Sequence, residues 1–272
     1  THYFSPHVRW GRCAVAAFSR WVAAQVDGMI APTGKVGDCC RAMAFAAPVF
    51  VGALTGHRPA GASSRRAIPC AGRFCGPAWA SLRKNTVLVC VGRLAEEKNI
   101  QELLKLRASL GSLPVTLLLV GDGPDRPRLE QVAHDLRLEA PAVIFAGMVA
   151  PGGGAGVVPA GGPVRQRLLQ RDPGPDLYRG TAAGVPALCR ADLCLEGVIL
   201  EGENGWQYHS TAEFRQRLEE FLASPETHEA LKRRAAESAE QFSAQRFAQR
   251  VERIYQMQLA RRAASCVQGV TA

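Results

Sequence analysis

Arg93 and Lys98 are the side chains of this 272-residue chain best suited to bind an anion. Residues 89–91 read as the end of a buried strand, Gly92 as a tight turn, and residues 100–110 as the helix that follows. A helix start offers unpaired N–H groups and a positive dipole end, and glycine allows close approach of a ligand. Two cations at such a turn suit a diphosphate, although an ordinary turn with solvated charges explains the same residues equally well.

The pattern of strand, glycine and helix repeats farther along the chain. Gly121 and Gly123 follow one apolar run, and Gly147 follows the next. The expected elements are strands at 114–120 and 142–146, a helix at 128–138, a helix end with a turn and strand over 183–188, and helices from 210 to about 262. This alternation predicts an α/β fold with a parallel sheet that binds its ligand at the carboxyl ends of the strands.

Five short motifs carry a family resemblance. They are V-G-R-L-A-E-E-K-N at 91–99, L-L-V-G-D-G-P at 118–124, V-I-F-A-G at 143–147, A-A-G-V-P-A at 182–187 and E-G-E-N-G-W at 201–206. In this order they resemble the C-terminal half of a retaining family-4 glycosyltransferase of the GT-B fold. His2-Tyr3-Phe4 resembles a segment of members that glycosylate diacylglycerol, and residues 25–33 resemble the last strand and turn of the family's acceptor-binding domain.

The resemblance implies roles for particular residues. Arg93 and Lys98 would hold the diphosphate of a nucleotide-sugar, and Gly92 would allow its approach. The loop of Gly121 and Gly123 and the turn at Gly147 would border the nucleoside. The implied reaction transfers a hexose, with glucose as the first candidate, to an acceptor such as a lipid. The nucleotide-sugar is then a co-substrate and no further cofactor is expected; no carboxylate cluster predicts a metal site.

The resemblance also divides the chain. Residues 1–55 are expected to be the remnant of an acceptor-binding domain in which the chain begins partway. Residues 85–208 are expected to form a nearly complete Rossmann-like nucleotide-sugar-binding domain, and residues 209–272 a set of C-terminal helices. One of these helices is expected to cross back to the N-terminal domain.

Two stretches depart from the family pattern. Residues 56–84 and 152–181 are rich in Gly, Pro and Arg and show no helix or strand period. One choice of codons for residues 174–180, read one base later, encodes G-L-T-Y-I-E-A, which resembles the family's glutamate motif. We therefore expect these stretches to be translated out of frame. The two motif glutamates would overlap the codons of Arg171 and Arg179, so no catalytic residue is carried over.

The net charge of +9 arises mainly in these two stretches. Residues 57–83 contribute +5 and residues 152–180 contribute +2, which together are seven of the nine charges. The rest of the chain is nearly neutral, which argues against a nucleic-acid partner. No apolar run is long enough to span a membrane, so we expect a cytoplasmic protein. A basic and aromatic segment near the N-terminus suggests a helix that either lies on an anionic membrane or packs its Trp faces into the acceptor domain. Its residues are Arg9, Trp10, Arg12, Arg20 and Trp21.

Three interpretations stay open. The chain is either an active glycosyltransferase or an inactive, truncated and frameshifted fragment of one. A different Rossmann-type nucleotide-binding protein, such as a dinucleotide-dependent oxidoreductase, is the third possibility. Against it, Gly121-Asp122-Gly123 is followed by Pro124 and lacks the third glycine and the downstream acid of the dinucleotide fingerprint.

Overall fold

The computed structural model describes residues 9–31, 33–42, 47–51, 85–148, 166–169 and 175–270. Contacts divide the chain into two compact units. We call residues 57–241 the sheet unit, and residues 1–56 together with 242–272 the terminal unit.

A six-stranded parallel sheet forms the centre of the sheet unit, with the strand order β5-β4-β3-β6-β7-β8. The strands are β3 Thr86–Val91, β4 Val115–Val120, β5 Val143–Gly147, β6 Gln166–Leu169, β7 Ala187–Arg190 and β8 Gly205–Tyr208. The expected α/β fold is thereby confirmed. Because the strands are parallel, their carboxyl ends lie along one edge of the sheet, where a ligand site is expected.

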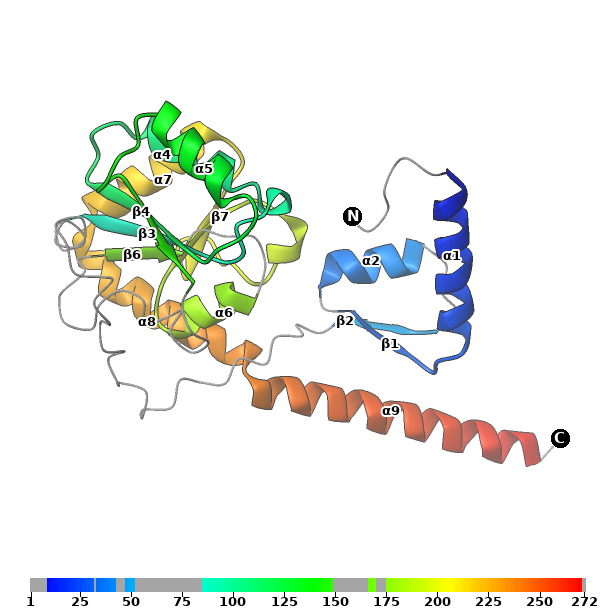
Figure 1. Ribbon diagram of the computed structural model, residues 1–272. Helices are drawn as coiled ribbons and strands as arrows, with labels where there is room; N and C mark the ends of the chain where they lie inside the picture. The colour runs from blue at the N-terminus through cyan, green and yellow to red at the C-terminus, as the bar shows by residue number, and fades with distance from the viewer. Residues whose placement is uncertain are drawn as a thin grey trace. The chain divides into compact units, whose positions relative to one another are not determined.

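Helices cover both faces of this sheet, and Figure 1 shows α4, α5 and α7 on one side and α6 and α8 on the other. Their bounds are α4 Ile100–Ser109, α5 Arg126–Asp135, α6 Pro175–Ala182, α7 Thr211–Ala223 and α8 His228–Ala239. Short 3-10 helices lie at η1 Glu96–Lys98, η2 Leu193–Leu195, η3 Pro225–Thr227 and η4 Glu240–Phe242. The core has two parts because strand side chains alternate: Leu88 and Cys90 belong to one cluster, and Val87 and Val89 to the other.

The helix expected over 128–138 is displaced toward the N-terminus. It starts at Arg126, with Pro127 in the first turn, where a missing backbone N–H removes no helical hydrogen bond. It ends at Asp135, because Arg137 adopts a left-handed φ of 56° that a helix cannot continue through.

Although residues 152–181 show no helix or strand period in the sequence, two described segments of this stretch form regular structure. Strand β6 lies between β3 and β7 and pairs in parallel with both. Helix α6 follows, anchored by the buried side chains of Leu177 and Tyr178. The two flanking strands present backbone N–H and C=O groups that need hydrogen-bond partners. They therefore favour any segment that can complete the hydrogen-bond ladder of the sheet, whatever its composition. The rest of the stretch, and all of residues 56–84, lie outside the described residues, so the frameshift stays a prediction.

The terminal unit contains α1 Arg9–Ala24, β1 Met29–Ala31, α2 Gly34–Ala42, β2 Val49–Val51 and α9 Ala244–Val270. Strands β1 and β2 pair in parallel, and Arg262 of α9 forms an ion pair with Asp27 at 2.7 Å. On α1, Phe18 and Trp21 stack on each other and are each more than 60% exposed. Trp21 is therefore not packed into a core. Among the described residues no helix combines the length and apolarity needed to cross a membrane.

Candidate functional site

A cavity of about 250 Å³ opens at the carboxyl ends of β3 and β7. The first turn of α4 forms another wall. The lining residues are Cys90, Val91, Gly92, Arg93, Lys98, Asn99, Ile100, Glu102, Leu103, Arg190 and Tyr208. The structure thus brings together three of the predicted site residues, Gly92, Arg93 and Lys98, at the edge of the sheet where ligands of parallel α/β folds bind.

The turn that presents Lys98 is built from local sequence. Strand β3 ends at Val91, and the N–H of Gly92 donates to the carbonyl of Val120 at 2.8 Å, which ties the turn to β4. The 3-10 helix η1 ends at Lys98, and Asn99 then takes a left-handed φ of 47° before α4 begins. Asparagine tolerates this conformation better than most residues, so the chain can change direction here without glycine.

Gly121, Gly123 and Gly147 are not among the residues that line the cavity. A Cβ atom on Gly121 would lie 1.9 Å from the carbonyl oxygen of Gly92, and one on Gly123 would lie 2.2 Å from that of Leu94. The Gly121 N–H also donates to the Gly147 carbonyl at 2.8 Å. These glycines let the loop after β4 pack closely under the Arg93 turn. Their predicted contact with a nucleoside stays a prediction.

The side chains of Arg93 and Lys98 have no hydrogen-bond or ion-pair partner within the part of the chain that the structure describes. Such cations, facing one cavity, provide unused donors and positive charge for a bound anion.

Sequence reasoning missed two charged residues of the cavity, Glu102 and Arg190. Arg190 ends β7, and its Nη1 forms an ion pair with Oε1 of Glu102. The other carboxylate oxygen of Glu102 accepts from Nδ2 of Asn99 at 2.7 Å. The sequence could have indicated Arg190, since a charged residue that ends a parallel strand lies at the edge of the sheet where ligands bind. The sequence could not have indicated Glu102, because a glutamate in the first turn of a helix is common.

The charge of the cavity favours an anion. Its described lining carries Arg93, Lys98 and Arg190 against the single carboxylate of Glu102, both oxygens of which are engaged. Among the described residues, no group of three or more His, Cys, Asp or Glu side chains is placed to hold a metal ion. The arrangement can neutralise phosphate groups directly through side-chain cations.

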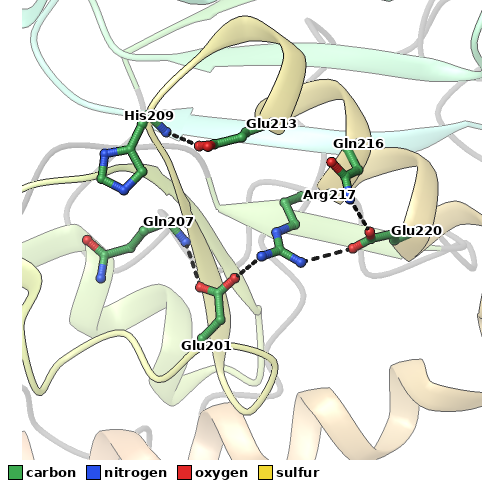
Figure 2. A network of polar contacts seen from close by, with 7 residues as sticks. All are labelled: Glu201, Gln207, His209, Glu213, Gln216, Arg217 and Glu220. Atoms are coloured by element: carbon green, nitrogen blue, oxygen red, sulfur yellow. Dashed lines mark hydrogen bonds and ion pairs between the residues drawn. The ribbon is translucent and has the colours of Figure 1, made fainter.

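A second hollow, of about 790 Å³, lies beside β8 and the start of α7. Figure 2 shows the polar network along it, formed by Glu201, Gln207, His209, Glu213, Gln216, Arg217 and Glu220. Arg217 bridges Glu201 at 2.7 Å and Glu220 at 3.1 Å, and the His209 N–H donates to Glu213 at 2.6 Å. The Glu201–Arg217 ion pair joins the turn before β8 to α7, and Glu213 and Glu220 contact residues on α7 or just before it. The network therefore serves the fold and is not our candidate site.

The fold has relatives among solved structures, whereas no family model and no curated protein matches the sequence. Sucrose-phosphate synthase from Thermosynechococcus elongatus matches with a TM-score of 0.69 and 18% identity over 90% of this chain and 61% of its own. HepE of Anabaena in complex with UDP matches with a TM-score of 0.70 and 17% identity over 93% and 70%. The pneumococcal O-GlcNAc transferase GtfA, bound to UDP and GlcNAc, matches with a TM-score of 0.64 and 15% identity over 89% and 47%.

This chain therefore spans less than two thirds of the length of the sucrose-phosphate synthase and of GtfA. Identities below 20% establish a common architecture and leave activity to be argued from the site. The parallel sheet, the helices on both of its faces and these matches show that the chain has the fold of the GT-B glycosyltransferases.

Proposed function

We propose that the sheet unit binds the diphosphate of a nucleotide-sugar, with a UDP-sugar as the first candidate. The observation that carries the proposal is a pair of cationic side chains, Arg93 and Lys98, which line one cavity at the carboxyl end of β3 and have no partner among the described residues. Structures of HepE bound to UDP and to UDP-glucose support the choice of nucleotide, because HepE has the same fold.

The reaction that we propose for the intact protein is transfer of a hexose, glucose first, with retention at the anomeric carbon. The leaving group of this reaction is a nucleoside diphosphate on which negative charge develops, and preorganised cations stabilise that charge. For the acceptor we propose a lipid at a membrane surface, on the resemblance of His2-Tyr3-Phe4 and on the exposed Phe18 and Trp21 of α1. Retention at the anomeric carbon and the choice of a lipid acceptor both rest on the family-4 resemblance.

The proposal is tested by titration calorimetry of UDP against the chain and two variants. Arg93→Ala and Lys98→Ala are each expected to weaken UDP binding roughly ten- to hundredfold, since a hydrogen bond to a charged group contributes about 1.5–3 kcal/mol. Arg233→Ala is the matched control, because Arg233 is an exposed helical arginine paired with Glu237 outside the cavity. Affinity that stays unchanged in both cavity variants would remove the basis of the proposal.

A second candidate is nucleotide-sugar binding without transfer. It is favoured by the described cavity lining, in which Glu102 is the one carboxylate and is already engaged by Arg190 and Asn99. Assays of sugar transfer and of UDP binding on the same preparation separate the two candidates. Sequencing the gene in all three frames across residues 152–181 tests whether a glutamate pair is encoded there; stop codons in the shifted frame would refute the frameshift.

A further inference from the structure

We infer that Arg190 is a third cation of the anion site and that Glu102 is its resident counter-ion, which a bound diphosphate displaces. The inference rests on the proposed function and describes how the charge of that same site is controlled. It starts from the placement of Arg190, which lines the cavity together with Arg93 and Lys98 although it is far from both in sequence.

Arg190 reaches the cavity because of strand order. Strands β3 and β7 lie two positions apart in one parallel sheet, with β6 between them. Their carboxyl ends therefore share an edge, and the residue that ends β7 faces the same space as the turn that follows β3. The planar guanidinium of arginine matches two phosphate oxygens at once, which suits it to this position better than lysine.

Glu102 pairs with Arg190 through Oε1, while its Oε2 accepts from Asn99. The side chain of Arg190 in this pair is 59% exposed and that of Glu102 is 27% exposed. Ion pairs with such exposure contribute little to stability, so a ligand loses little by replacing this one. A diphosphate brings more negative charge than one carboxylate, and it brings it to three cations at once. The Glu102 carboxylate therefore competes with the bound phosphates.

The experiment uses inorganic pyrophosphate as the probe of the anion site and UDP as the probe of the nucleotide function. Titration calorimetry compares the full chain with Arg190→Gln, Glu102→Gln, the double variant and the control Arg233→Gln. Glutamine at position 102 removes the charge and retains an oxygen for Asn99, and circular dichroism checks that each variant is folded.

Arg190→Gln is expected to weaken pyrophosphate binding about tenfold, the usual loss for one charge-assisted contact. Glu102→Gln is expected to strengthen it about threefold when Arg190 is present and to leave it unchanged when Arg190 is replaced, which is a non-additive pair. The control Arg233→Gln should bind as the unaltered chain does.

Pyrophosphate affinity that is unchanged in Arg190→Gln, or effects of the two substitutions that simply add, would overturn the inference. A complete lack of pyrophosphate binding by the unaltered chain would overturn it as well. If UDP binds no more tightly than pyrophosphate while the Arg190 effects are present, the nucleotide function fails and the third cation stands.

Discussion

At the scale of single residues, the cavity is a set of charges that the fold leaves unbalanced. Arg93 and Lys98 lack partners among the described residues, and Arg190 has one that is partly exposed. The turn that carries Arg93 is held by a close backbone contact between Gly121 and Gly92. The position of Arg93 therefore depends on a glycine that is not among the residues lining the cavity.

Replacement of Gly121 tests this contact. Gly121→Ala is expected to lower the free energy of unfolding by roughly 2–4 kcal/mol, because the new Cβ would overlap a carbonyl oxygen and would require a strained backbone. The native φ of Gly121 is +137°. Gly111→Ala is the control, since Gly111 also has a positive φ, of 59°, but open space around it; it should cost only about 1 kcal/mol. Equal losses for both variants in urea unfolding would contradict the argument.

At the scale of elements, polar contacts set where helices begin and how they join the strands. At the start of α5, Arg128 donates to both carboxylate oxygens of Asp125, at 2.6 and 2.8 Å, and also reaches Gln101 of α4. At the start of α7, the backbone N–H of Glu213 donates to the Ser210 hydroxyl, which caps the helix. Farther along α7, Arg217 forms an ion pair with Glu201 in the turn before β8 (Figure 2).

The Asp125 contact predicts a dependence on pH. The hydrogen bond from Arg128 lowers the pKa of Asp125 below its ordinary value. Because the folded pKa lies below that of the unfolded chain, the ionised carboxylate adds stability at neutral pH, and this contribution is lost as the pH falls through the lowered pKa. Asp125→Asn should therefore have a lower melting temperature than the parent near neutral pH, and the difference should shrink below about pH 4. A difference that is constant with pH would contradict this assignment.

The pair of Glu201 and Arg217 should contribute little energy despite its short contact. Their side chains are 50% and 35% exposed, and exposed ion pairs typically contribute about 0–1 kcal/mol. A double-mutant cycle with Glu201→Gln and Arg217→Gln, followed by urea unfolding, should give a coupling energy below about 1 kcal/mol. A larger coupling would show that the network stabilises the junction of β8 and α7 more strongly than its exposure implies.

At the scale of the whole molecule, the described cavity belongs to one unit alone. All of its lining residues fall within the sheet unit, whereas α9 belongs to the terminal unit with α1, α2, β1 and β2. The sheet unit ends at Gln241, and the division at residue 208 expected from the sequence stays a prediction. Helices α7 and α8 accordingly belong to the sheet unit.

Ligand binding should therefore protect one unit. Hydrogen exchange followed by mass spectrometry with UDP at about a hundred times its dissociation constant should slow globally exchanging amides of β3 and β4 by about a hundredfold, equivalent to about 2.7 kcal/mol. Peptides from α9 should exchange at the rate of the free protein. Equal protection of α9 would mean that the two units unfold together.

Much of this architecture follows from local sequence alone. Residues 86–91 and 115–120 are apolar runs of strand length, each followed by a glycine. Composition and length alone are enough to predict that both runs form strands. The same local reasoning placed Arg93 and Lys98 at the carboxyl end of a strand, because a strand, a turn and a helix follow one another directly there. The α/β fold and the region of the site were predictable for these reasons.

Contacts between distant segments required the tertiary structure. Strand β6 forms in a stretch rich in Gly, Pro and Arg because β3 and β7 present unpaired backbone groups on either side of it, and no local period signals that. Arg190 joins Glu102, 88 residues earlier, because strand order brings the end of β7 beside the first turn of α4. The sequence by itself determined the strands β3 and β4 and the cations that follow β3, since these depend on neighbours along the chain. The pairing of Arg190 with Glu102 was decided only by the order in which the strands assemble.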